Sequence, residues 1–141
     1  MYKKHKHDII ILLTVFTLGV SLYLAIVHYM GFLVPCTITH GCETVLNSKY
    51  SVLVGLPLSV WGVLYSLAVI VLALLANHYK KAQSLLNWLL GLGAVGSVIF
   101  LSIQFFVLKQ VCQYCFTFDT LNIVIFLFNL NAEFVLSTDH R

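Results

Sequence analysis

Charged side chains are scarce in this sequence. Asp, Glu, Lys and Arg together make up 9% of the 141 residues, and hydrophobic residues make up 60%. A soluble domain usually carries about a quarter of its residues as charges. The shortage argues against a soluble globular protein, and no basic patch of a size that would hold nucleic acid is present. Water is therefore not the main solvent of this chain, and we expect lipid to surround it.

The sequence contains long uncharged stretches that could form membrane-spanning helices. A helix that rises ~1.5 Å per residue needs about 20 apolar residues to cross the ~30 Å hydrocarbon core of a bilayer. Four runs reach that length, at residues 9–33, 56–76, 85–108 and 111–130. We predict an all-α integral membrane protein in which residues 1–141 form a single four-helix bundle. The first run is too long for the apolar part of a signal peptide and no cleavage motif follows it, so we expect it to remain as a helix.

The positive charges predict the orientation of the bundle. By the positive-inside rule, the side that carries most Lys and Arg faces the cytoplasm. One side holds Lys3, Lys4, Lys6, Lys80, Lys81 and Arg141, and the other holds Lys49 and Lys109. Both termini and the link between the second and third helices are therefore expected in the cytoplasm. The loop at residues 34–55 and the junction before the fourth helix are expected outside.

The outer loop contains more apolar residues than a freely solvated loop would. It carries Val45, Leu46, Tyr50, Val52, Leu53 and Val54. Exposing such a segment to water is costly. We predict that the loop folds back on the bundle as a lid, with a short helix after Cys42.

All four cysteines lie on the predicted outer side, as two pairs. Cys36 and Cys42 are in the loop, and Cys112 and Cys115 form a C-x-x-C motif where the fourth helix begins. A helix N-terminus stabilises a thiolate, and an oxidising compartment permits disulfides. Two dithiol pairs on one side of a membrane suit an electron relay by thiol–disulfide exchange, which needs no metal.

Two other uses of these cysteines remain open from the residues alone. Two disulfides that only staple a non-catalytic membrane protein would also explain four extracytoplasmic cysteines. A zinc site of four thiolates, with His40 as a further ligand, is less favoured because Cys36 and Cys42 are more widely spaced than a usual ligand pair. His40 is otherwise a solvated loop residue or a group that favours a neighbouring thiolate.

The fourth predicted helix carries a polar face. Steps of three and four residues place its members on one side of a helix, which must then face the bundle interior. They are Cys112, Cys115, Asp119, Asn122, Phe126 and Asn129. An acid inside a membrane is a functional candidate. Asp119, one turn below Cys115, has two interpretations. It offers a proton or a hydrogen bond to an oxygen of a quinone that accepts the relay's electrons in the membrane, or it forms a hydrogen bond with a neighbouring helix.

The motifs resemble those of the vitamin K epoxide reductase family, and its bacterial members in particular. The matching segments are Pro35-Cys36, five intervening residues, Cys42 to Tyr50 (CETVLNSKY), Gly55 to Gly62 (GLPLSVWG) and Cys112 to Cys115 (CQYC). The match extends over nearly the whole chain. A lone C-x-x-C would be a weak signal, whereas this combination is highly specific.

The resemblance implies a four-helix bundle around a quinone, with the C-x-x-C pair beside the quinone ring. Cys112 would exchange with the loop pair, Cys115 would face the quinone, and Ser48 would lie near the active site. Leu58 and Asp119 stand where vertebrate members have an asparagine and a tyrosine that bind the vitamin K ring. Reduction of a plain quinone, such as ubiquinone, menaquinone or another vitamin K-like quinone, is therefore expected rather than reduction of vitamin K epoxide, which remains the alternative.

The resemblance also implies a partner. The loop pair would exchange with an extracytoplasmic thioredoxin-like protein, and bacterial members look like functional analogues of disulfide-bond formation protein B. Some relatives carry a fused thioredoxin-like domain, which does not occur before Arg141. We therefore expect a thiol oxidase of the Dsb type to act in trans, with this chain in the inner membrane of a bacterium.

Overall fold

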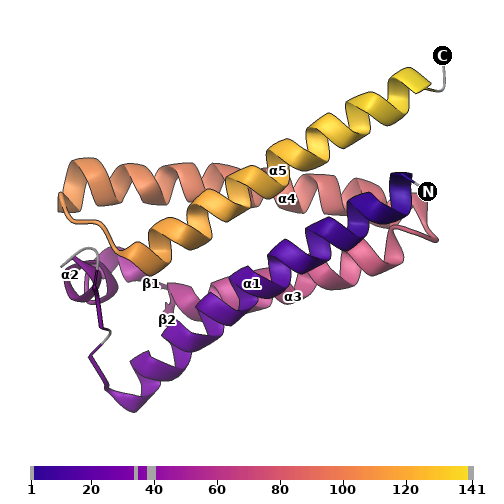
Figure 1. The fold of residues 1–141 in the computed structure, drawn as a ribbon. Helices are drawn as coiled ribbons and strands as arrows, with labels where there is room; N and C mark the ends of the chain where they lie inside the picture. Colours follow the sequence, from indigo (N-terminus) through magenta and orange to yellow (C-terminus); the bar gives the residue numbers. More distant parts are fainter. Residues whose placement is uncertain (1, 34, 38–40, 140–141) are drawn as a thin grey trace.

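The computed structural model describes residues 2–33, 35–37 and 41–139. Four long helices dominate it (Figure 1): α1 (Tyr2–Met30), α3 (Leu58–Leu75), α4 (Lys80–Ser102) and α5 (Gln113–Asp139). The shorter elements are α2 (Cys42–Leu46), the 3-10 turn η1 (Lys49–Ser51), β1 (Val52–Leu53), β2 (Leu56–Pro57) and the π-helical turn η2 (Ile103–Leu108). The start of α1, the end of α5 and the α3–α4 link lie at one end of the bundle, whereas α2 and the strands lie at the other.

The prediction of four membrane-spanning helices is confirmed. Within the described residues, four helices are long and apolar enough to cross a bilayer, over Lys4–Met30, Leu58–Leu75, Lys80–Leu108 and Gln113–Thr138. The helices begin and end differently from the apolar runs. α1 and α4 begin earlier than predicted, and α5 continues to Asp139 instead of ending near residue 130. Hydropathy detects only the part of a helix that lipid surrounds, while backbone hydrogen bonding continues into the polar turns beyond it.

An apolar core joins the helices in the half of the bundle that contains the termini. α1 packs against α3 and α5, and α4 packs against α5 and α3. The core consists of Ile10, Val69, Ala73, Ala76, Ala82, Leu86, Leu90 and Ile125. Large apolar side chains such as Leu12 and Trp88 are exposed on the outer surface, as expected for a protein whose surroundings are lipid.

Polar side chains tie the helices together near the same end. The Lys6 ammonium donates to the Glu133 carboxylate, linking α1 to α5. His7 is fully buried, with Nδ1 2.8 Å from Asn77 Oδ1 and Nε2 2.7 Å from Gln83 Oε1. Buried polar groups in a membrane bundle need such partners, so this end is held by hydrogen bonds as well as by apolar packing.

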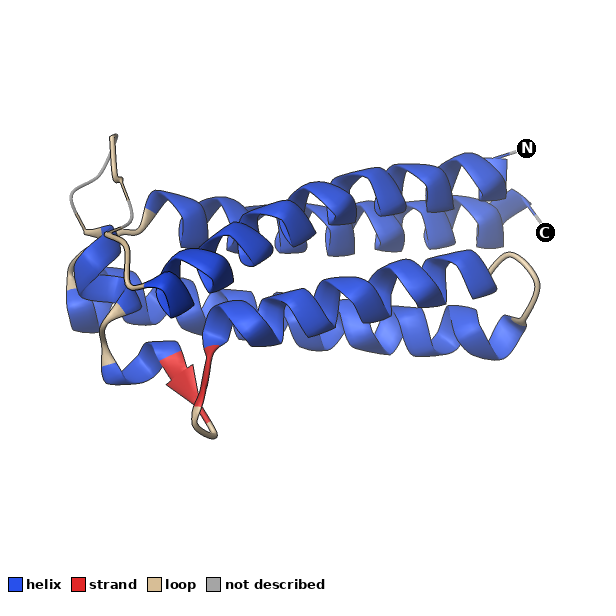
Figure 2. Ribbon diagram, turned by 90° about the horizontal axis from the view of Figure 1, so that it is seen from below, coloured by secondary structure: helices blue, strands red, loops and turns tan. Residues whose placement is uncertain are grey.

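The predicted lid is present at the opposite end. α2 follows Cys42 as expected, and the antiparallel pair β1–β2, which was not predicted, comes next. The hairpin turn places Val54 and Gly55 at positive φ (55° and 79°), as a type I′ turn requires at both central positions. The hairpin protrudes beside the start of α3 (Figure 2), and the Trp61 indole N–H donates to Leu53 O at 3.0 Å. This bond ties the hairpin to α3.

The last turns of α4 depart from α-helical geometry. Residues Ile103–Leu108 form a π-helical turn, and Lys109 then takes a left-handed conformation (φ 52°). π-helical turns occur often at functional sites because they shift which side chains face inward. Here the turn buries Gln104 completely, and its carbonyl accepts the Gln110 N–H at 3.1 Å. The chain thus reverses tightly before α5.

Candidate active site

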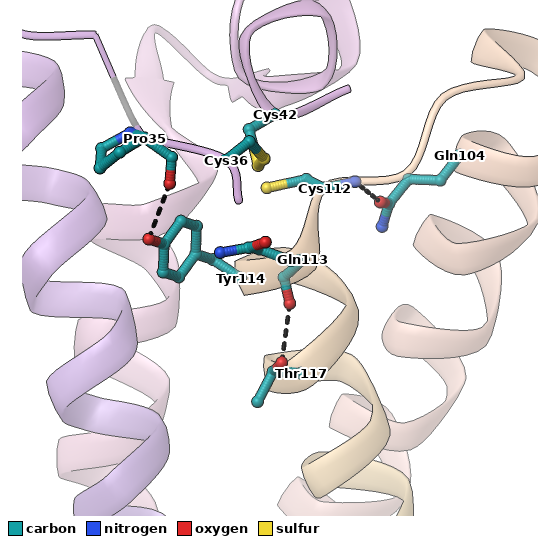
Figure 3. Close-up of a disulfide and its surroundings, with 8 residues drawn as sticks. All are labelled: Pro35, Cys36, Cys42, Gln104, Cys112, Gln113, Tyr114 and Thr117. Carbon is teal, nitrogen blue, oxygen red and sulfur yellow. Dashed lines mark hydrogen bonds between the residues drawn. A yellow bond between two sulfur atoms is a disulfide. The ribbon is translucent and has the colours of Figure 1, made fainter. Parts of the chain in front are cut away.

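All four cysteines meet at the end of the bundle covered by the lid. Cys36 and Cys42 form a disulfide with their Cα atoms 6.0 Å apart, whereas Cys112 and Cys115 are free thiols. Cys42 and Cys112 are both 0% exposed and share one apolar cluster with Val45. Figure 3 shows the Cys112 side chain extending toward the disulfide. The loop pair therefore lies directly against the C-x-x-C pair.

Cys112 occupies the N-cap position of α5. Its carbonyl accepts the first intrahelical hydrogen bond, from the Phe116 N–H at 2.8 Å. The hydrogen bond from the Cys115 side chain lowers the pKa of the Cys112 thiol from 9.0 to about 7, in spite of burial, and hydrogen bonds from the backbone of Cys115 and Tyr114 act in the same direction. A sulfur at the N-cap thus takes the place of the usual capping oxygen, and the free N–H groups of the first helical turn stabilise its thiolate.

Two contacts hold the loop over Cys112. The loop passes so close to the segment before α5 that a Cβ on Gly41 would lie 2.8 Å from Val111 N, a distance that only glycine avoids. On the other side, the Tyr114 hydroxyl donates to Pro35 O at 2.9 Å. Each contact involves residues adjacent in sequence to cysteines. The two contacts together therefore fix the position of the loop cysteine pair relative to the C-x-x-C pair.

A cavity opens beside Cys115. Its volume is about 280 Å³, and its walls come from α1, the lid, the start of α3, α4 and α5. Cys115 and Asp119 line it together with the apolar side chains of Leu58, Phe100 and Phe118. Mostly apolar walls with a few polar groups are typical of a site for a small molecule.

A second cavity of about 260 Å³ adjoins the first, with Asp119, Leu58 and Phe118 among the residues that line both. Tyr65 and Trp61 add aromatic walls. Two buried polar atoms on these walls, Asp119 Oδ2 and the Tyr65 hydroxyl, have no hydrogen-bond partner among the described residues. Buried polar atoms are rarely left unpaired, so these two are candidates to bind the polar edges of a ligand.

The predicted polar face of the fourth helix does face the interior. Asp119, Asn122 and Asn129 are 5%, 2% and 0% exposed, and Asn129 donates to Asn87 Oδ1 on α4 at 2.8 Å. Ser97 of α4 interacts with the Asp119 carboxyl group, whereas Asp119 Oδ2 has no hydrogen-bond partner among the described residues. Both interpretations of Asp119 therefore have support, because the carboxyl group meets a neighbouring helix and one of its oxygens is free to bind a ligand.

The remaining predicted site residues differ in where they lie. Leu58 lines both cavities and packs against the cysteine cluster. Ser48 lines neither, because its hydroxyl is turned to the Val45 carbonyl at 2.8 Å. Ser51 is the loop serine that lines the first cavity. His40 lies outside the described residues.

Several residues of the site were not predicted from the sequence. Tyr65, Trp61 and Phe100 line the cavities, but they stand in apolar runs where large side chains usually face lipid. Gln104 was also missed, although its side-chain oxygen accepts the Cys112 N–H at 3.0 Å. Its signal was available: a glutamine within an uncharged membrane helix is costly unless it has a specific partner.

Comparison with known families accords with this arrangement. The family model described as "Vitamin K epoxide reductase family" matches residues 8–130, which include all four cysteines and the residues lining both cavities. Comparison with curated protein sequences gave no match. Membership implies a membrane oxidoreductase that uses thiols to reduce quinones or their epoxides. With its four membrane helices and a match over most of its length, the chain belongs to the vitamin K epoxide reductase family.

Proposed function

We propose that this protein is a quinone-dependent thiol–disulfide oxidoreductase that supports disulfide-bond formation in secreted proteins. Electrons would pass from an extracytoplasmic thioredoxin-like partner of the Dsb type to the loop pair, then to Cys112 and Cys115, and then to a quinone. One observation carries the proposal: Cys112 extends toward the Cys36–Cys42 disulfide, while Cys115, one helical turn away, lines the cavity. The free state of Cys112 and Cys115 favours this relay over a bundle stapled by two disulfides.

Exposure distinguishes the two loop cysteines. Cys42 is fully buried against Cys112, whereas Cys36 is partly exposed. The partner thiolate therefore attacks the Cys36 sulfur, forming a mixed disulfide and releasing Cys42 as a thiolate. A second thiol of the partner then displaces Cys36, so the partner leaves as a disulfide and the loop holds a dithiol.

The buried cysteines carry the exchange between the pairs. When Cys112 and Cys115 are joined, the Cys42 thiolate attacks the Cys112 sulfur and Cys115 leaves as a thiolate. Cys36 then attacks Cys42 in this new mixed disulfide, which restores the Cys36–Cys42 bond and leaves Cys112 as a thiolate. The N-cap environment stabilises that thiolate, which makes Cys112 a good leaving group. The resulting arrangement, a loop disulfide beside a free inner pair, is the one the structure contains.

The inner dithiol then reduces the quinone. Oxidation of Cys112 and Cys115 to a disulfide releases two electrons and two protons, which together convert a quinone to a quinol. The aromatic walls suit a flat apolar ring, and the two unpaired groups, the Tyr65 hydroxyl and a protonated Asp119 carboxyl, would donate to its polar oxygens. Leu58 offers no polar group, which favours a plain quinone over the vitamin K epoxide of the alternative function.

The charge distribution supports an orientation with the cysteines outside. Lys4, Lys80 and Lys81 lie at the end of the bundle that contains the termini, opposite the lid. The positive-inside rule then directs that end to the cytoplasm, so the loop pair meets partners in an oxidising compartment. In a bacterium this arrangement corresponds to the inner membrane, with the cysteines toward the periplasm.

One experiment tests the electron donor, the electron acceptor and the direction of electron flow together. Purified protein is mixed with a reduced thioredoxin-like protein and a soluble quinone, and quinol formation is followed. Cys115→Ala should abolish quinol formation while the loop still forms a mixed disulfide with the partner. Full quinone turnover by Cys115→Ala would refute the assignment, and an active vitamin K epoxide reductase reaction with a dithiol would favour the alternative.

A further inference from the structure

Gln104 is a buried polar residue that the proposed relay does not use. It lies in the π-helical turn after α4, is 0% exposed and lines neither cavity. Its Oε1 accepts the backbone N–H of Cys112 at 3.0 Å, while its Nε2 has no partner among the described residues. A buried amide with half of its hydrogen-bonding capacity unused destabilises a fold, so its presence calls for a functional explanation.

The geometry corresponds to that of a capping box. In an ordinary capping box, the N-cap side chain accepts an N–H of the first helical turn, and a Glu or Gln three residues later accepts the N–H of the N-cap residue. Cys112 is the N-cap residue of α5, since its carbonyl accepts the Phe116 N–H, and the backbone N–H groups of Tyr114 and Cys115 favour its thiolate. Three residues after Cys112 stands Cys115, whose side chain bonds the Cys112 sulfur instead.

We propose that Gln104 completes this capping box from the neighbouring helix and is a positioning residue for the Cys112 thiolate. By holding the N–H of Cys112, it fixes the backbone so that the sulfur faces both the loop disulfide and the N–H groups of the first turn. The π-helical turn is what makes this reach possible, because it brings Gln104 inward just before the chain reverses toward α5. That this capping serves the electron relay rests on the proposed function, whereas the capping of Cys112 by Gln104 does not depend on it.

Several other titratable groups surround Cys112, and the test must leave them unchanged. The titratable groups that face it are Cys115 and Asp119 on α5, with Tyr114 nearby, and the loop contributes Cys36 and Cys42, which do not titrate while they are joined. None of them changes when Gln104 is replaced. An effect on the thiolate can therefore be assigned to the lost hydrogen bond.

Gln104→Met is the informative variant, since it keeps the length of the side chain and removes both the acceptor and the unpaired Nε2. The full-length protein, with all four cysteines, is equilibrated with mixtures of reduced and oxidised glutathione. It is then acid-quenched, unfolded and alkylated, and the peptide containing Cys112 and Cys115 is scored as dithiol or disulfide. In this equilibrium the inner disulfide and two glutathione thiols exchange for the inner dithiol and one glutathione disulfide, so no quinone is needed.

The expected result depends on pH in a defined direction. Stabilising the thiolate stabilises the reduced pair, so Gln104→Met should shift the equilibrium about fivefold toward the disulfide at about pH 8.5, where Cys112 is ionised. At about pH 5.5, where the thiol is protonated in both proteins, the two should coincide. Gln110→Met is the matched control, because Gln110 lies in the same segment and is exposed. Among the described residues, its only hydrogen bond is the one that its backbone N–H donates to the Gln104 carbonyl, which the substitution keeps.

Two outcomes would overturn the proposal. One is equal equilibria for Gln104→Met and the wild-type protein at both pH values, and the other is a difference that does not change with pH, which a purely structural defect would produce. Should Gln104→Met fail to fold, Gln104→Asn, whose shorter side chain cannot reach the Cys112 N–H, is held to the same criterion. Absence of quinone reduction by the wild-type protein would instead refute the proposed function and leave this result intact.

Discussion

Gly41 lies against Val111, with no room for a side chain between the loop and the segment before α5. A Cβ on Gly41 would lie 2.8 Å from Val111 N and 2.9 Å from Val111 O, both of them backbone atoms that cannot rotate away. Each of these residues precedes a cysteine, Cys42 in one case and Cys112 in the other. The close approach of the two segments therefore sets how near the two cysteine pairs can come.

Gly41→Ala should slow exchange between the pairs. The added methyl group separates the segments by a few tenths of an ångström or more, and thiol–disulfide exchange requires the attacking sulfur to contact its target. We expect quinol formation from a reduced thioredoxin-like protein to fall about tenfold, while reduction of the loop disulfide itself stays within about twofold of the wild-type rate. Gly19→Ala is the control, because a Cβ at that helical position would have no atom of the described residues within 4 Å apart from its own turns of helix. Wild-type turnover by Gly41→Ala would show that the close contact is not needed.

The pKa of Cys112 predicts a pH dependence. Its value is lowered to about 7, so about half of the thiol is ionised at that pH and only about a tenth one unit below it. Because closing the Cys112–Cys115 disulfide draws on the Cys112 thiolate, a single turnover of pre-reduced protein with excess quinone should slow as the pH falls through 7 and level off above about pH 8. The thiolate absorbance of Cys36→Ser/Cys42→Ser protein, titrated without quinone, provides an independent check. A midpoint near the ordinary thiol value of 9 in both measurements would contradict the N-cap role of the sulfur.

Tyr114 should control how readily the loop disulfide is reached. Its hydroxyl donates to Pro35 O at 2.9 Å, next to Cys36, and its ring packs against Tyr23 with centroids 5.5 Å apart. Tyr114→Phe keeps the ring and removes the hydroxyl, which also interacts with the Tyr23 side chain; its hydrogen bond to Pro35 is typically worth about 1 kcal/mol. Reduction of the Cys36–Cys42 disulfide by a small dithiol should become about fivefold faster, with single-turnover reduction of quinone unchanged. Tyr29→Phe is the control, since Tyr29 is exposed. Equal reduction rates for Tyr114→Phe and the wild-type protein would mean that this bond does not restrain the loop.

Some features of this protein follow from local patterns, and these were predictable. The four spans depend on hydropathy over about twenty residues, and the inward face of α5 depends on helical periodicity, which Asp119, Asn122 and Asn129 obey. The short helix after Cys42 also follows from its neighbours in the sequence. In these cases the information lies within one segment.

Other features depend on contacts between segments that are distant in the sequence. Gln104 faces Cys112 only because the π-helical turn changes the helical phase at the end of α4, and a regular period gives no sign of that change. Ser48, expected near the active site, turns away because the Val45 carbonyl lies within reach of its hydroxyl. The cavity wall at Tyr65 depends on how α3 packs on α4, where its hydroxyl fits against Gly93.

The Tyr65 hydroxyl should contribute to quinone binding. It is buried in the wall of the second cavity with no partner among the described residues, so removing it breaks no internal hydrogen bond. Tyr65→Phe should therefore leave thermal stability unchanged or slightly increased, because an unpaired buried hydroxyl is unfavourable. If the hydroxyl donates to a quinone oxygen, the same change should raise KM for quinone about fivefold, with kcat changed less than about twofold.

Steady-state kinetics with a range of quinone concentrations measure both constants for the Tyr65 variant. Tyr79→Phe serves as the control, since Tyr79 is exposed at the opposite end of the bundle. A rise in KM without loss of stability would identify the hydroxyl as a ligand contact, because a packing defect would lower both stability and kcat. Unchanged KM would mean that the quinone oxygens bind elsewhere. Among the described residues, Asp119 Oδ2 would then be the unpaired atom left on the cavity wall, and it can donate to a quinone oxygen when the carboxyl group is protonated.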